Sequence, residues 1–205
     1  MTGAVLSDLD GATTAVLTME LQRGIVGDLA VMRELAAAAR PTFGNVAALC
    51  AAVRAGGGLV VHNTMTFRPG GEGFTTNSRI QKAGLRLNLG VLTIGEPGAA
   101  VVDEIEPADA DIEVSRHTGM TPFTGTALAH VLSARGIRTV VATGVSLNIG
   151  VLGLVLSAAD LGFEVVVPRD AVVAVPEEFG EQVLAHTVGL LATVCRTADV
   201  LAALA

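Results

Sequence analysis

Charged and polar side chains stand directly after the most apolar runs of this sequence. Glu20 follows the run TTAVLTM, and Arg116 and His117 come shortly after the run IEV. A carboxyl group near a basic group can hold a polar substrate or pass a proton to and from it. Glu20, Arg116 and His117 are therefore the candidate catalytic residues, provided that the fold brings these separate segments together.

A second group of candidates lies in the stretch TVVATGVSLNIGVLGLVLSAAD, which carries no charge before its last residue. Its β-branched residues give way to a helix-like pattern, which indicates a buried strand followed by a buried helix. The stretch is long enough to span a bilayer, but its Thr, Ser and Asn residues and its change of pattern argue against a membrane helix. The residues at 146–150 are thus expected where a strand turns into a helix.

The elements that position these residues follow from apolar runs that alternate with helix-like segments. Continuous apolar strands of this kind are typical of a parallel sheet that is covered on both faces. We expect strands at 13–19, 58–62, 112–114, 138–144, 163–168 and 192–196. We expect helices at 29–54 (interrupted at Pro41), 124–135, 147–161, 177–191 and after the sixth strand, and a long loop at 63–98. The predicted fold is an α/β, three-layer α-β-α sandwich of Rossmann type, with a mostly parallel sheet of about six strands in a single domain, 1–205.

In such a fold, ligands bind outside the carboxyl ends of the strands. Gln22 and Arg68 also follow predicted strands, so they are candidates for substrate binding, and Phe123 is a candidate for an apolar pocket wall. Neither G-x-G-x-x-G after a strand nor G-x-x-x-x-G-K-[ST] occurs, so no nucleotide cofactor is expected.

The composition excludes several kinds of partner. A net charge of −7 without a block of Lys or Arg argues against nucleic acid and anionic membranes. Cys50 and Cys195 lack metal-ligand spacing, so we expect them to be reduced, buried and inert. The acidic run at 103–111 reads as a solvated surface, and no metal site is expected because no histidine accompanies it. The first residues show no secretory signal pattern, and the default is a cytoplasmic protein.

Long segments of the chain resemble a known family. The segments AVLTMELQRGIV, EVSRHTGMTPFTG and TVVATGVSLNIGVLGLVLSAADLGFEVVVPRDA, with the spacing between them, are similar to the isochorismatase-like superfamily of cysteine hydrolases. The resemblance runs from about residue 13 to the C-terminus. The family pattern has an Asp, a Lys and a Cys, and the matching positions here are Glu20, His117 and Gly150.

The resemblance also implies a binding mode for the turn after the fourth strand. In the family, this Gly-Val-Ser turn and the helix start behind it point backbone N–H groups at the substrate. Val145, Ser146, Ile149 and Gly150 are therefore expected to form a cradle for the substrate. No thiol stands at Gly150, so amidase chemistry through a thioester is not expected.

The isochorismatase branch of the family implies a chemistry that needs no cysteine, in which the strand-one carboxylate protonates a vinyl ether. The expected function is a hydrolase that acts on a small metabolite by cysteine-independent acid/base chemistry, with Glu20 paired to His117 or Arg116. The alternatives are a catalytically silent ligand-binding member of the family and an oligomeric scaffold. Because family members commonly form oligomers, a homodimer or homotetramer is expected.

Each candidate also has a structural interpretation. Glu20 can pair with Arg23, and His117 can simply be solvated. Arg68 can be an exposed loop cation, and core packing is the default for Phe123. His62, at the end of the second predicted strand, is expected to be a histidine with its hydrogen bonds satisfied.

Overall fold

A seven-stranded sheet forms the centre of the protein in this computed structural model, which describes residues 6, 7 and 9–205. Every strand pairing in it is parallel, and the strand order is β3-β2-β1-β4-β5-β7, with β6 pairing to β4. The strands are β1 (Thr14–Met19), β2 (Leu59–Met65), β3 (Ile112–Arg116), β4 (Thr139–Val145), β5 (Glu164–Pro168), β6 (Val172–Val173) and β7 (Thr193–Cys195). The predicted α/β sandwich with a mostly parallel sheet is confirmed.

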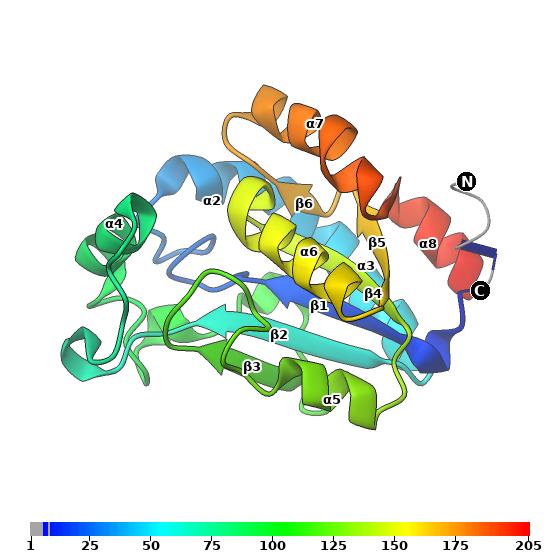
Figure 1. The fold of residues 1–205 in the computed structure, drawn as a ribbon, viewed down its shortest axis with the longest axis horizontal. Coiled ribbons are helices and arrows are strands. Elements are labelled where there is room, and N and C mark those ends of the chain that lie inside the picture. The colour runs from blue at the N-terminus through cyan, green and yellow to red at the C-terminus, as the bar shows by residue number, and fades with distance from the viewer. Residues whose placement is uncertain (1–5, 8) are drawn as a thin grey trace.

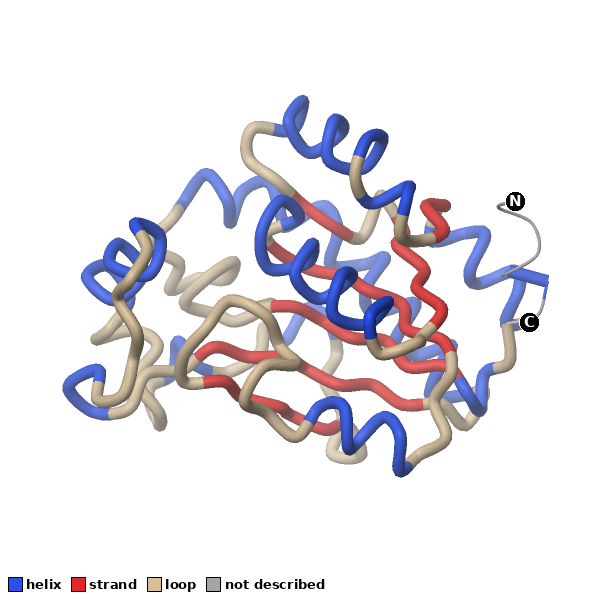
Figure 2. The backbone as a smooth tube through the Cα atoms, viewed as in Figure 1, coloured by secondary structure: helices blue, strands red, loops and turns tan. Residues whose placement is uncertain are grey.

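Helices cover both faces of this sheet. The helices are α2 (Arg33–Ala39), α3 (Phe43–Ala55), α4 (Arg79–Asn88), α5 (Leu128–Ala134), α6 (Leu152–Asp160), α7 (Glu177–His186) and α8 (Thr197–Leu204). Figure 1 shows α5 and α6 in front of the strands and α3 behind them. Figure 2 shows the same layering, with the strands enclosed between helices.

The strands are apolar on both sides because each side packs on a different helix layer. On β1, Leu17 belongs to a core cluster with residues of α5, α6 and α7, whereas its neighbour Val16 belongs to a second cluster with residues of α3 and α8. All six residues of β1 are buried. Successive side chains of a strand point to opposite faces, so a strand buried on both faces reads as a continuous apolar run.

The structure differs from the expected elements in several places. The helices expected from residues 29 and 124 begin only at Arg33 and Leu128, and β3 continues to Arg116. β6 is a two-residue strand that the pattern did not reveal. β2 continues to Met65 through the polar residues Asn63 and Thr64, which are buried. The segment at 63–98, expected to be a loop, contains the helix α4.

The order of the strands identifies the edge of the sheet at which a ligand site is expected. β1 lies between β2 and β4, so the chain moves outward from β1 in both directions. Ligands of open parallel sheets bind where the strand order reverses, outside the carboxyl ends of the strands. Here that position is the end of β1 and β4, which Glu20 and Ser146 follow directly.

A membrane-spanning helix is absent from the part of the chain that the structure describes. The apolar stretch that raised the question divides into β4, a short helical turn at Leu147–Val151 and α6.

Candidate active site

A cavity of about 620 Å³ opens at the carboxyl ends of β1 and β4. Its floor contains residues that follow β1 and β4 and the last residue of β3, namely Glu20, Arg116, Ser146, Ile149 and Gly150. Its walls come from the segments around α2 and α4, including Met32, Leu35, Phe74, Ile80 and Gly84. Figure 1 shows α4 beyond the arrowheads of β1 and β2, on the side where these strands end. The volume lies in the range of pockets that bind small metabolites.

Glu20 is held by an unusual backbone conformation. Its φ is 54°, in the left-handed region that a non-glycine residue rarely adopts. Its backbone N–H donates to the carbonyl oxygen of Asn63 at 2.9 Å, which fixes it to the end of β2. Strain of this kind persists where the surroundings impose it, and it clusters at functional sites.

Arg116 is the basic partner that the fold brings to Glu20. Its Nη2 donates to Oε1 of Glu20, and the two side chains are 5% and 19% exposed. Its Nε lies 3.5 Å from the carbonyl oxygen of Gly119. The third nitrogen, Nη1, is buried and finds no acceptor among the described residues. The ion pair on the floor of the cavity therefore joins a buried guanidinium to a partly exposed carboxylate, and one donor of Arg116 has no partner among the described residues.

His117 lies elsewhere, although it is the next residue in the sequence. It lines a second, more open hollow with Glu96, Glu113 and Ser115, and its Nδ1 lies 3.0 Å from Oγ1 of Thr66. Adjacent residues of a strand point to opposite faces, and His117 continues the alternation of β3 beyond Arg116. The structure therefore brings Arg116, and not His117, to Glu20.

The turn after β4 contributes backbone to the cavity. The peptide bond between Val145 and Ser146 is cis, and Oγ of Ser146 donates to Oδ1 of Asn148 at 2.9 Å. A Cβ atom at Gly150 would lie 3.0 Å from Cε of Met19, so that side chain fills the space next to Gly150. Ser146, Ile149 and Gly150 line the cavity, whereas Val145 is buried in the core beneath it.

The remaining sequence candidates lie outside the lining of this cavity. Gln22 is fully buried and links the end of β2 to the turn at Pro97–Ala99, because it bonds both the N–H and the carbonyl oxygen of Met65 and the carbonyl oxygen of Ala99. Arg68 is exposed. Phe123 is buried in the core and stacks on Phe163, with ring centroids 6.4 Å apart.

Neither cysteine is suited to act as a nucleophile. Burial raises the pKa of the Cys50 thiol to about 12 and that of the Cys195 thiol to about 11. The thiolate is the reactive form, so a thiol with such a pKa is inert at neutral pH. Cys50 lies within α3 and Cys195 ends β7, and neither lines the cavity. Within the described residues, no three His, Cys, Asp or Glu side chains gather as a metal site.

Sequence reasoning missed the wall that α4 contributes. Ile80, Gln81, Gly84 and Asn88 of this helix line the cavity. A signal was present, because Ser78 and Gln81 form a capping box in which each side chain bonds the other residue's backbone N–H. The S-x-x-Q spacing is a recognised mark of a helix start.

The open space beside Gly84 leads to a stability prediction. Nothing lies within 4 Å of a Cβ atom placed at Gly84, so Gly84→Ala is expected to add helix propensity without a clash. The free energy of unfolding should rise by about 0.5–1 kcal/mol, measured by urea denaturation. Gly180→Ala in α7 is the contrasting variant, because its Cβ would lie 3.0 Å from Cβ of Ala174 and should yield no gain. Loss of stability in Gly84→Ala would mean that other atoms lie closer to Gly84 than the structure shows.

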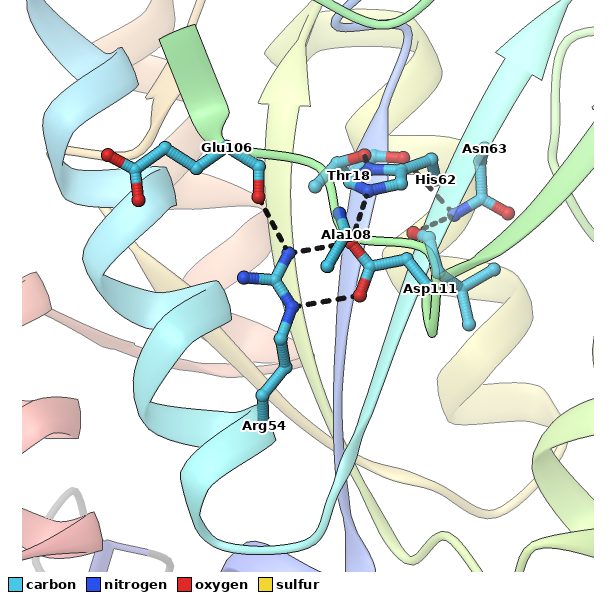
Figure 3. Close-up of polar contacts among 8 residues, drawn as sticks. Thr18, Arg54, His62, Asn63, Glu106, Ala108 and Asp111 are labelled. Carbon is cyan, nitrogen blue, oxygen red and sulfur yellow. Dashed lines mark hydrogen bonds and ion pairs between the residues drawn. The ribbon is translucent and has the colours of Figure 1, made fainter. Parts of the chain in front are cut away.

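A second cluster of titratable residues lies on the α3 face of the sheet, away from the cavity (Figure 3). Nε and Nη2 of Arg54 donate to the two carboxylate oxygens of Asp111 at 2.8 and 2.6 Å. His62 stands between Asp111 and Thr18, at 3.0 and 2.9 Å. Because the carboxylate can only accept, Nε2 of His62 donates to Asp111 and Nδ1 accepts from the Thr18 hydroxyl.

The protonation of this cluster follows from its burial. Burial lowers the pKa of the His62 imidazole, although the hydrogen bond to Asp111 acts in the opposite direction. Burial alone would raise the pKa of the Asp111 carboxyl, but hydrogen bonds from Arg54, the N–H of Ala108 and His62 lower it overall. His62 is thus a satisfied histidine, as expected. The Asp111 side chain, only 4% exposed, is not part of the solvated surface that its acidic run suggested.

The sheet, its helix layers and the charged pair where the strand order reverses define an α/β protein with a cavity at the carboxyl ends of its strands. The chain belongs to the isochorismatase family, since the isochorismatase domain matches residues 14–199.

Individual relatives agree with this family. A cysteine hydrolase from Pseudomonas syringae pv. phaseolicola 1448A shares the fold, with a TM-score of 0.81 at 20% identity over 96% of this chain and 94% of that one. The N-carbamoylsarcosine amidase from Thermoplasma acidophilum has a TM-score of 0.72 at 26% identity over 90% and 96% of the two chains. An uncharacterised isochorismatase family protein, YecD of Escherichia coli O157:H7, is 38% identical over 97 residues, which is 47% of this chain and only half (50%) of that relative's length. The chain therefore has an isochorismatase-family hydrolase fold.

Proposed function

We propose that this protein is a hydrolase that acts on a small metabolite by acid–base chemistry at Glu20, without a cysteine nucleophile. The observation that carries the proposal is the ion pair of the partly exposed Glu20 with the buried Arg116 on the floor of the cavity. The pair lies beside the start of the helical segment at Leu147–Val151, where helix geometry favours developing negative charge. The family and its hydrolase relatives support the reaction class.

The partner of Glu20 favours one direction of proton transfer. Arg116 carries a permanent positive charge, and its Nη2 donates to Oε1 of Glu20, which is the geometry of an ion pair. Glu20 is therefore proposed to act as a general base, rather than as the proton donor that the family resemblance implied. It takes a proton from a water molecule, and the resulting hydroxide attacks the electrophilic carbon of the substrate. The leaving group departs with a proton returned from Glu20.

The residues at the family positions support a route that avoids a thiol. Residue 150 is a glycine, and the space beside it holds the side chain of Met19. Both cysteines of the chain lie outside the cavity lining. In this proposal, residues other than Asp, Lys and Cys occupy all three family positions. Arg116, and not His117, supplies the positive charge that the Lys has in the family pattern.

Side-by-side assays of wild type and Glu20→Gln test the proposal. The panel contains isochorismate, small esters and small amides, and release of product is followed for each. For any substrate that wild type hydrolyses, Glu20→Gln is expected to lower kcat/KM by about 10²–10⁴-fold, because the amide cannot take the proton. Glu178→Gln, an exposed change on α7, is the matched control.

Circular dichroism of both variants shows whether the fold is intact. Equal turnover in wild type and Glu20→Gln would remove Glu20 from the mechanism. Absence of turnover across the panel would favour the alternative, a catalytically silent ligand-binding protein, for which the replaced family positions and the space-filling Met19 are the specific argument. The proposal also includes a cytoplasmic location and a homodimer or homotetramer.

A further inference from the structure

Two buried side-chain atoms lack a hydrogen-bond partner within the described part of the chain. One is a donor, Nη1 of Arg116, and the other is an acceptor, Oδ1 of Asn63. The two side chains have relative exposures of only 5% and 1%. Buried donors and acceptors are nearly always paired, because an unpaired one forfeits its hydrogen bonds to water. One shared partner can satisfy both atoms if the fold brings them together.

The sheet places Asn63 and Arg116 on the same face. Asn63 of β2 is paired with Val114 of β3, and Arg116 lies two residues beyond Val114 on the same strand. Side chains two residues apart on a strand point to one face, and so do the side chains of paired residues on neighbouring strands. Val114 belongs to the core cluster that contains residues of α5 and α6. Asn63 and Arg116 therefore both point to the α5 and α6 side of the sheet.

The side chain of Arg116 crosses β2 to reach its partner. Arg116 belongs to β3, whereas Glu20 follows β1, and β2 lies between these two strands. Asn63 is at the level of Glu20 on β2, because its carbonyl oxygen accepts from the N–H of Glu20 and its backbone pairs with that of Met19. The guanidinium therefore lies over the part of β2 that carries Asn63.

The amide of Asn63 is turned so that its oxygen faces the guanidinium. Its Nδ2 donates to the carbonyl oxygen of Thr18 at 3.2 Å and lies 3.5 Å from that of Val61 (Figure 3). Both carbonyl groups lie nearer the amino-terminal ends of β1 and β2 than Asn63 does. The nitrogen and oxygen of an amide diverge from one carbon, so Oδ1 points toward the carboxyl end of β2, where the side chain of Arg116 crosses.

We propose that Asn63 is a positioning residue for Arg116 and acts through one enclosed water molecule, which donates to Oδ1 of Asn63 and accepts from Nη1 of Arg116. A water molecule can do both, and enclosed waters commonly bridge buried groups that have no other partner. Asn63 then fixes both members of the ion pair, because its carbonyl oxygen also binds the N–H of Glu20. The inference concerns the geometry of the pair and does not depend on the proposed reaction.

A crystal structure of the wild-type protein, at a resolution that shows ordered water, tests the bridge directly. We expect a water molecule within about 3.2 Å of both Oδ1 of Asn63 and Nη1 of Arg116. A direct hydrogen bond between these two atoms overturns the inference. Separate protein partners for the two atoms, or no water density between them, overturn it as well.

Two variants of similar size separate the oxygen of Asn63 from its nitrogen. Asn63→Asp and Asn63→Leu both lose the donor to Thr18, but only Asn63→Asp keeps an oxygen for the bridge. Nitrogen NMR of the arginine side chains reports on the guanidinium, since its two Nη atoms give separate resonances while hydrogen bonds prevent rotation. We expect separate Arg116 resonances in wild type and Asn63→Asp. In Asn63→Leu they should merge, or the Nη1 protons should exchange with solvent about tenfold faster or more.

Control variants make this readout specific to Arg116. Arg116→Gln assigns the resonances, because it removes them. Asn77→Leu makes the same change at an exposed asparagine and should leave them as in wild type. Equal behaviour of Asn63→Asp and Asn63→Leu would limit Asn63 to its bond with Thr18 and overturn the inference. If Asn63→Leu does not fold, the crystal structure of wild type still decides.

The state of the guanidinium and turnover are separate readouts in this design. Merged Arg116 resonances in Asn63→Leu, with no turnover of the substrate panel by wild type, support the inference and count against the proposed function. Unchanged resonances in Asn63→Leu, together with turnover that Glu20→Gln abolishes, support the proposed function and overturn the inference.

Discussion

Asp111→Ala is expected to lower the free energy of unfolding by about 3–5 kcal/mol, because removal of one partner leaves the other buried groups unpaired. The Asp111 carboxylate receives hydrogen bonds from Arg54, from Nε2 of His62 and from the N–H of Ala108. Its side chain is 4% exposed and that of Arg54 24%, so water can replace only part of these contacts. Urea denaturation of wild type and variant measures the difference.

Asp109→Ala is the matched control, since Asp109 lies two residues away in the same acidic run and is exposed. Its change in stability should stay within about 0.5 kcal/mol. Arg54→Met combined with Asp111→Ala should cost less than the sum of the two single changes, because each already removes their shared interaction. Equal losses for Asp111→Ala and Asp109→Ala would show that the cluster does not stabilise the fold.

Gly144→Ala is expected to cost more than about 4 kcal/mol or to prevent folding. The φ of Gly144 is +101°, which L side chains rarely adopt. A Cβ atom there would lie 2.3 Å from the carbonyl oxygen of Met19 and 2.8 Å from its nitrogen. Both contacts are with the backbone of β1, which cannot rotate out of the way, so the two central strands would have to separate.

Thermal unfolding followed by circular dichroism, with the yield of folded protein, measures this effect. Gly44→Ala in α3 is the control, because Gly44 is exposed and nothing lies within 4 Å of its Cβ position. That variant should be as stable as wild type or gain up to about 1 kcal/mol. A Gly144→Ala protein with wild-type stability would mean that β1 and β4 are further apart than the structure shows.

Most of the fold was predictable because the sheet is buried on both faces. Runs such as that of β1 carry no charged residue, and Thr14 and Thr18 are its only polar ones, so strand is not confused with loop. The prediction of strand ends failed where polar residues are buried within a strand. Asn63 and Thr64 extend β2 because their side chains find partners inside the protein, on the backbone of Thr18 and on Glu113. A sequence pattern does not reveal such partners.

The location of the candidate site could be predicted from the sequence, but the basic residue that pairs with Glu20 could not. Glu20 and Gly150 could be placed at one edge because the carboxyl ends of parallel strands meet there. The choice between Arg116 and His117 depended on the register of β3, since a shift of one residue exchanges the faces to which they point. The pairing of Met65 with Arg116 fixes that register, and it arises from contacts between segments distant in sequence. Gln22, predicted to bind substrate, is fully buried instead, because its amide joins the end of β2 at Met65 to the turn that ends at Ala99.

The cavity is built from two kinds of parts, strand ends below and helical segments such as α4 at the side. The backbone of Met19 pairs with Asn63 and Gly144 of the neighbouring strands, and the N–H of Glu20 donates to the carbonyl oxygen of Asn63, so the sheet fixes the backbone of these two residues. Ile80 and Gly84 contact the cavity from a segment that no strand pairing constrains. Substitutions in α4 can therefore reshape the wall of the cavity without disturbing the sheet that carries Glu20 and Arg116.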